Sequence, residues 1–213
     1  MRPLFQRAGH EFFAPSYTGL GERTHLAQPT VNLDTHIQDV IGTLRFERLH
    51  DVVLIGHSYG GVVATGVAAR ARAHVRKLVY LDAFIPQSGQ CAFDLLPPGL
   101  AAQTEQLVRE QGDGWRVPSS PLPPDTSSDD VAWAQPLRMP QPIETLRQPL
   151  VFDEQQLPPR AYVCCTRILP GDPFRPSAER ARTEGWPYAE MDASHNPHIT
   201  APAELLAVLS RFL

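Results

Sequence analysis

A serine between glycines interrupts an apolar stretch of the chain. The segment GHSYG (residues 56–60) follows the apolar residues 52–55 and precedes a small-residue, helix-compatible segment, residues 62–72. A serine in G-x-S-x-G between a strand and a helix lies on a sharp turn at the carboxyl end of the sheet, where the helix N-terminus favours developing negative charge. This pattern predicts Ser58 as a nucleophile. A helix N-cap serine beside glycines is the alternative interpretation.

A serine hydroxyl needs a base at neutral pH, and in the chain order that accompanies this turn the base follows the last strand. His195 lies there, in MDASHNPHIT, and His198 is the alternative. We favour His195 on chain order and motif position. His57 adjoins the nucleophile but is expected to point elsewhere on the turn. The remaining histidines are predicted to be solvated on surface, loop or helix positions: His10, His25, His36, His50 and His74.

Two carboxylates compete to orient the base. Asp172 follows the predicted strand RAYVCC, but Gly-Asp-Pro is also an ordinary turn sequence. Asp82 lies near the end of KLVYLDAF, on a strand that otherwise reads as buried. A carboxylate there costs several kcal/mol unless it is paired or hydrogen-bonded, and a histidine would be such a partner. We therefore favour Asp82, with Asp172 as the alternative acid and Asp192 as a third choice.

Short apolar runs alternate with helical patterns, which predicts βαβ units and a mostly parallel sheet flanked by helices. Asp34 is expected to cap a helix, and DVVLIG is expected to be a strand buried on both faces. The segments predicted as strands are HEFFAP (10–15), DVVLIG (51–56), KLVYLDAF (77–84), RAYVCC (160–165) and PYAEMDA (187–193). The chain ends with a predicted amphipathic helix, TAPAELLAVLSRFL.

The middle of the chain is rich in proline. Thirteen of the 22 prolines lie between Pro86 and Pro159, where a helix is predicted near residues 101–111. Prolines this dense favour a loop-and-helix insertion over sheet strands. We expect residues 1–85 and 151–213 to form the α/β core, and residues 86–150 to form a cap or lid within the same domain.

Composition indicates an ordinary globular protein. The formal net charge is −4 and there is no basic run, which argues against nucleic acid or an anionic membrane as a partner. The first residues do not read as a signal peptide, and no window is apolar enough to span a bilayer. Three cysteines, two of them adjacent, are expected to be reduced core residues. These features predict a cytoplasmic protein.

With these residues placed, the chain resembles the α/β-hydrolase superfamily, and more closely its small bacterial esterases related to plant methylesterases and hydroxynitrile lyases. The matching pieces are GHEFFAPSYTGLGERTHL, NLDTHIQDV, DVVLIGHSYGGVVATGVA, LVYLDAFIPQSGQ and SHNPHITAPAEL. The resemblance implies Ser58 as nucleophile, His195 as base and a cap inserted after Phe84. It also supports Asp82 as the acid. The N–H of Tyr59 would supply one oxyanion donor.

The resemblance has one departure. Such proteins open with a strand ending in a His-Gly loop that contributes to the oxyanion hole, and this sequence contains no His-Gly dipeptide. It starts instead in what reads as the following helix, MRPLFQRAGH. The HEFFAP and DVVLIG strands would then pair directly, or leave a gap, or the sequence is a truncated version of a longer protein. The second oxyanion donor is therefore not identified.

The predicted function is hydrolysis of a small-molecule carboxylic ester by a Ser-His-Asp triad through an acyl-enzyme. Neither a metal nor an organic cofactor is required. One alternative is a catalytically impaired member of the fold that binds a small molecule. A lower-ranked alternative is a hydroxynitrile-lyase-like enzyme using the same triad. A homodimer is left open.

Overall fold

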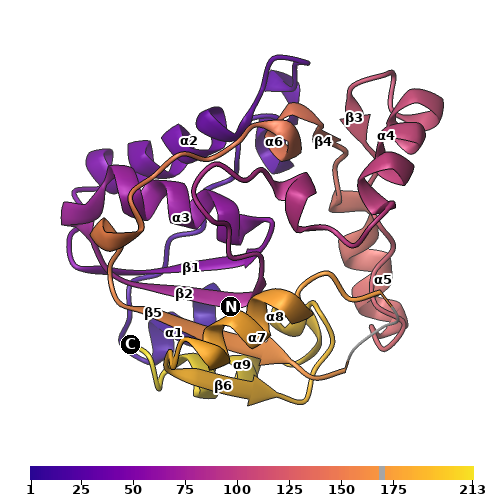
Figure 1. Cartoon of the computed structure of the whole chain (residues 1–213). Coiled ribbons are helices and arrows are strands. Elements are labelled where there is room, and N and C mark those ends of the chain that lie inside the picture. Colours follow the sequence, from indigo (N-terminus) through magenta and orange to yellow (C-terminus); the bar gives the residue numbers. More distant parts are fainter. Residues whose placement is uncertain (168–170) are drawn as a thin grey trace.

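The computed structural model describes residues 1–167 and 171–213 (Figure 1). Four parallel strands form the central sheet in the order β1-β2-β5-β6. The strands are β1 (Val52–Ser58), β2 (Val75–Ala83), β5 (Arg160–Cys165) and β6 (Tyr188–Met191). The α/β class and these four predicted strands are confirmed.

Helices cover both faces of the sheet, and each face has its own apolar core. One core is formed with α2 (Leu33–Phe46), α3 (Gly60–Arg70) and α7 (Arg175–Thr183), and the other with α1 (Arg2–Arg7) and α9 (Pro202–Leu209). Alternation along the strands divides the residues between these cores. Cys164 therefore packs in the first core and Cys165 in the second, both as free thiols, as expected.

The cap of α2 differs from the sequence prediction. Asn32, and not Asp34, is the N-cap: its side chain accepts from the N–H of Thr35 at 3.1 Å, and the Thr35 hydroxyl accepts from the Asn32 N–H. Asp34 lies in the first turn and pairs with Arg70 at 2.6 Å. Within the described parts of the chain, no helix is long and apolar enough to cross a bilayer.

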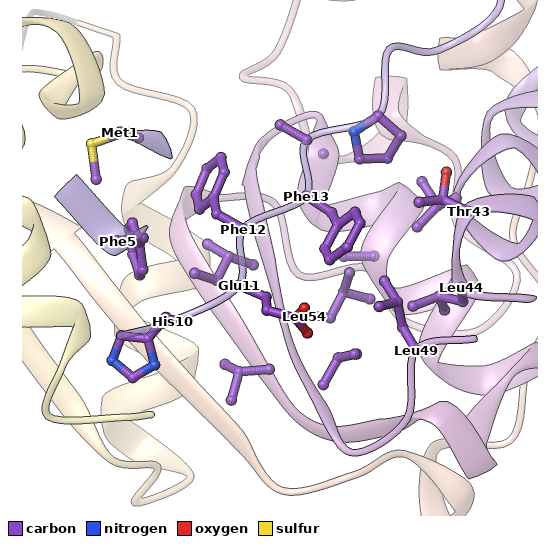
Figure 2. Close-up of a pocket in the computed structure, with 18 of the residues that line it drawn as sticks. Met1, Phe5, His10, Glu11, Phe12, Phe13, Thr43, Leu44, Leu49 and Leu54 are labelled. Atoms are coloured by element: carbon purple, nitrogen blue, oxygen red, sulfur yellow. The ribbon is translucent and has the colours of Figure 1, made fainter. Parts of the chain in front are cut away.

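The prediction of a strand at HEFFAP is wrong. Residues 10–15 form no strand and run alongside β1 without pairing with it (Figure 2). A cavity of about 970 Å³, which we call the β1 groove, lies between them. With no partner strand, residues 10–15 have no ladder to join, and β1 is an edge strand. β1 is therefore half-buried, and the prediction that DVVLIG would be buried on both faces is also wrong.

The proline-rich segment lies beside the carboxyl ends of the strands (Figure 1). It carries a helix where one was predicted, α4 (Leu100–Gln111). Its other elements are β3 (Arg116–Val117), which pairs antiparallel with β4 (Gln141–Pro142), α5 (Ser128–Ala134) and α6 (Glu144–Arg147). A short helix, α8 (Pro197–Thr200), precedes α9. The 3₁₀ turns are Gly21–Leu26, Arg72–His74, Ala92–Leu95, Gln135–Leu137 and Glu154–Gln156.

The first turn of α3 approaches the end of β2 very closely at Gly61. A Cβ at this position would collide with the carbonyl oxygen of Phe84 and lie 3.0 Å from the Ala83 Cβ. Gly60 is different, because a Cβ there would lie at an ordinary 3.5 Å from the Tyr17 hydroxyl. The packing of α3 therefore requires a glycine at position 61 and not at position 60.

We predict that Gly61→Ala lowers the free energy of unfolding by about 1–3 kcal/mol, because the added methyl overpacks backbone that cannot yield. The matched variant Gly60→Ala should leave stability unchanged or raise it by up to about 1 kcal/mol, because alanine is the better helix former. Urea unfolding followed by circular dichroism measures both. Equal losses in the two variants would contradict the packing argument.

Candidate active site

Ser58 lies at the junction of β1 and α3 in a strained backbone conformation. Its φ of +56° is in the left-handed region, which non-glycine residues rarely adopt. The turn demands a glycine at position 56, where a Cβ would lie 2.6 Å from the Gly60 carbonyl oxygen and 2.8 Å from the Gly61 Cα. The serine turn therefore requires glycine at positions 56 and 61, whereas the second glycine of the G-x-S-x-G pattern, Gly60, has room for a Cβ.

Asp82 and His195 are in direct contact. The Asp82 Oδ2 lies 2.7 Å from the His195 Nδ1, and the Oδ1 accepts from the Cys165 N–H at 3.2 Å. Asp82 is 5% exposed and has a φ of +42°. It occupies an irregularity in the β1–β2 register, where Ser58 pairs with Ala83 and Asp82 is passed over. This irregularity turns the carboxylate from the strand toward the loop that carries His195.

Two rings hold the imidazole of His195. Phe174 stacks on it with ring centroids 4.4 Å apart and planes 8° from parallel, and His57 packs nearby at 4.6 Å. The His57 Nε2 lies 2.6 Å from the His195 carbonyl oxygen. Because a carbonyl only accepts, this nitrogen carries the proton. The prediction that His57 points away from the site is wrong, since it fixes the backbone of the histidine loop.

The structure brings Asp82 and His195 together and places Ser58 at the end of the adjacent strand. The Ser58 carbonyl accepts from the Phe84 N–H at 3.2 Å, which ties the ends of β1 and β2. Among the hydrogen bonds of the described residues, none joins the Ser58 hydroxyl to His195, and the Tyr59 N–H has no protein acceptor. The N–H of Tyr59 is thus free to meet a ligand beside the serine.

The other candidate residues have different partners. The Asp172 carboxylate accepts from the Phe174 N–H at 2.9 Å, as in an ordinary aspartate turn. Asp192 pairs with Arg167 at 3.0 Å on the surface. The His198 ring lies against His57, with centroids 4.9 Å apart, and not against the carboxylate of Asp82.

A buried polar cluster behind the serine was not foreseen. His36, expected on the surface, is fully buried: its Nδ1 lies 3.1 Å from the Tyr59 hydroxyl and its Nε2 lies 3.1 Å from the Thr18 carbonyl oxygen. Tyr17 stacks on the imidazole at 4.7 Å. Helical spacing carried the signal, because position 36 lies three residues after Leu33 on the apolar face of α2. The cluster anchors the residue after Ser58 to α2.

Three histidines around the site are held neutral. Burial lowers the pKa of His36 to about 4. Burial, with an added effect of the nearby His195, lowers the pKa of His198 to about 4. The pKa of His57 falls well below its ordinary value, chiefly by burial and then through His195 and His198. At neutral pH these three rings therefore bind and pack without carrying charge.

The profile of the alpha/beta hydrolase family matches residues 1–208, nearly the whole chain. The chain belongs to the alpha/beta hydrolase family. Among its relatives, a carbendazim-hydrolyzing esterase of Nocardioides sp. (strain SG-4G) is 34% identical over 218 residues, covering 96% of this chain and 89% of the relative. A match to an esterase over nearly the whole chain supports the conclusion that this protein is a hydrolase.

Solved structures of other alpha/beta hydrolases share the fold. An extracellular alpha/beta-hydrolase from a Paenibacillus species superposes with a TM-score of 0.82 at 22% identity, covering 98% of this chain and 90% of that one. A methylesterase from Arabidopsis superposes with a TM-score of 0.73 at 22% identity, covering 99% and 91%. At 22% identity, these two matches show that the fold is shared and do not show a shared activity.

The neutral histidines make the stability of this alpha/beta hydrolase depend on pH. Below pH 6.5 the unfolded chain binds protons at His36 and His198, while the folded chain does not until about pH 4. Lowering the pH from 6.5 to 4 therefore lowers the free energy of unfolding, by about 1.4 kcal/mol per pH unit for each of these two histidines. The lowered pKa of His57 acts in the same direction. Above pH 6.5 this contribution is complete and constant.

Urea unfolding at a series of pH values measures the slope. We predict that His36→Gln, whose amide can donate to Thr18 and accept from Tyr59, reduces the slope between pH 6 and 4.5 by about one proton. The same slope in this variant and the wild type would contradict the assignment of a neutral, buried His36.

Proposed function

We propose that the protein is a serine carboxylic ester hydrolase in which Ser58 is the nucleophile, His195 the general base and Asp82 the residue that orients it. The observation that carries this proposal is the 2.7 Å contact between a buried carboxylate and His195 beside a strained serine turn. Asp82 is favoured over Asp172 because only Asp82 bonds to the imidazole, while Asp172 closes a turn.

The geometry supports an ordered transfer of one proton. The Nδ1–H of His195 donates to Asp82, which leaves the Nε2 lone pair to accept the Ser58 proton. The serine oxygen attacks the ester carbonyl, and the imidazolium then protonates the departing alcohol, which leaves an acyl-serine. Water, activated by the same imidazole, attacks the acyl carbon and releases the carboxylic acid and the free serine.

The negative charge that develops on the carbonyl oxygen needs donors. The Tyr59 N–H and the amino end of the 11-residue helix α3 are the donors next to Ser58. The hydrogen bond between His36 and the Tyr59 hydroxyl keeps the Tyr59 backbone in place. Removing one such donor lowers the rate about 100- to 1,000-fold in other serine hydrolases, which is the size of the contribution that we expect from the Tyr59 N–H.

Surroundings and relatives support a small ester with an uncharged group near the base. Phe84 and Phe174 pack together with ring centroids 4.7 Å apart, next to the His195 imidazole. The Nocardioides relative is named for esterase activity on carbendazim. Residues 86–150 are assigned as the cap of this site, because they lie beside the carboxyl ends of the strands (Figure 1).

We predict that a fluorophosphonate probe labels the wild type and not Ser58→Ala, because only an activated serine hydroxyl attacks the phosphorus. In-gel fluorescence measures the labelling. Equal labelling of both proteins would overturn the assignment of Ser58. The second candidate is a binding protein without turnover, and it is favoured because no hydrogen bond joins Ser58 to His195 among the described residues. A folded wild type that neither reacts with the probe nor hydrolyses activated esters would support this second candidate.

We predict that Asp82→Asn lowers kcat on an activated ester on the order of 10,000-fold, because an amide no longer selects the tautomer of His195 that accepts at Nε2. The matched variant Asp172→Asn should keep kcat close to the wild-type value, since its amide oxygen still accepts from the Phe174 N–H. Steady-state kinetics on 4-nitrophenyl acetate measures both. The reverse order of effects would transfer the role to Asp172.

A further inference from the structure

Two different contacts hold the imidazole of His195, one at its edge and one on its face. Asp82 meets the edge, with 2.7 Å between its Oδ2 and the His195 Nδ1. Phe174 covers a face, with its ring 8° from parallel to the imidazole and the two centroids 4.4 Å apart. The edge contact selects the tautomer of the base. The stack cannot do so, and it therefore acts on the tilt of the ring and on its charge.

The position of Phe174 is fixed by its own neighbours. Its side chain is buried, and its ring packs against Phe84 with centroids 4.7 Å apart. The carboxylate of Asp172 accepts from the Phe174 N–H at 2.9 Å, and the Phe174 carbonyl accepts from the Ala178 N–H at 3.0 Å. Both the backbone and the ring of this residue are therefore held where α7 begins.

A buried hydroxyl links the two contacts behind the imidazole. The hydroxyl of Tyr162 accepts from the Ala83 N–H at 3.1 Å and lies 3.1 Å from the Ala83 carbonyl oxygen. The same hydroxyl lies 3.5 Å from the Phe174 carbonyl oxygen. Because Ala83 directly follows Asp82, the carboxylate at the edge of the imidazole and the phenyl ring on its face belong to one closed circuit of contacts. Their relative positions are thereby set.

The stack matters most when the imidazole is charged. In the proposed reaction the proton of Ser58 moves to the His195 Nε2, and the ring stays a cation until it gives this proton to the departing alcohol. A cation over the face of an aromatic ring, within about 6 Å of its centroid, is attracted by the electron-rich face. The ring of His57, which packs nearby at 4.6 Å, is uncharged at neutral pH. The phenyl ring therefore favours the protonated form of the base over the neutral one.

We propose that Phe174 is a positioning residue for the base, whose ring stabilises the protonated form of His195 and fixes the tilt of its imidazole. This role deepens the proposed ester hydrolysis and rests on it. It also gives Asp172 a part in the site without contact to the imidazole, because the Asp172 carboxylate holds the Phe174 N–H.

Nuclear magnetic resonance of labelled histidines follows the protonation of His195 and needs no turnover. We expect Phe174→Leu to lower the midpoint of this titration by about 0.5 pH unit, because the cation loses its aromatic partner. Loss of packing alone would admit water to the imidazole and raise the midpoint. Phe174→Tyr keeps a ring and should restore the midpoint of the wild type. An unchanged or raised midpoint in Phe174→Leu would overturn the proposal.

A second phenylalanine gives the matched control for the titration. Phe84→Leu removes a ring that packs on Phe174 and not on the imidazole, so the midpoint of His195 should stay at its wild-type value. Equal shifts in Phe84→Leu and Phe174→Leu would contradict a direct stack. These variants leave unchanged the charged and titratable groups around the ring, which are Asp82, Asp172, Arg138, His57 and His198.

Steady-state kinetics distinguishes failure of this proposal from failure of ester hydrolysis. With 4-nitrophenyl acetate, Phe174→Leu should lower kcat about 2- to 5-fold, with a smaller effect on KM, because the stack acts on the charged base. An unchanged kcat in this variant would overturn the proposal. A wild type without turnover would refute ester hydrolysis, and the titration would still decide whether the ring stabilises the protonated imidazole.

Two substitutions of Asp172 test the support of Phe174. Both remove the negative charge, but only Asp172→Asn keeps an oxygen that accepts from the Phe174 N–H. Asp172→Ala should therefore have a lower titration midpoint and a lower kcat than Asp172→Asn. Equal values in the two variants would overturn the support of the stack by Asp172. This pair also tests the proposal if Phe174→Leu does not fold.

Discussion

A carboxylate buried at the end of β2 is the constraint around which the catalytic end of the sheet is arranged. Asp82 cannot be left ionised in an apolar strand end without partners, and it has two, the His195 ring and the Cys165 N–H. To reach them the backbone adopts a positive φ and the β1–β2 register skips a residue. The same irregularity sets Ser58 opposite Ala83 and thereby fixes where the serine turn begins.

Supporting residues hold the two halves of the proposed site from opposite sides. On the serine side, the cluster of Tyr17, His36 and Tyr59 ties the turn to α2. On the histidine side, Phe174 and His57 enclose the ring of His195. The close approach of Gly61 to the end of β2 joins the two sides. Each half is positioned by rigid elements and not by loops alone, which is what a preorganised site needs.

Local sequence patterns predicted most of the fold, because β-branched runs and helical spacing determine β1, β2 and α3 almost independently of their surroundings. The expected contact between Asp82 and a histidine is present, since the burial of a charge has few solutions, while the catalytic role of Asp82 stays a prediction. The failures depend on neighbours. HEFFAP has the composition of a strand but no strand beside it to bond with, and a strand needs a partner. His36 and His57 were judged by residue type, whereas their burial is set by α2 and by the loop of His195.

The neutrality of the histidines around the site has a consequence for where positive charge resides. His57 and His198 lie within 5 Å of one another, centroid to centroid, and burial lowers the pKa of each, so neither competes for a proton at neutral pH. In the proposed reaction the proton that leaves Ser58 therefore has a single destination. His57 and His198 thus stay uncharged beside the site until the pH falls to about 4, where His198 takes up a proton.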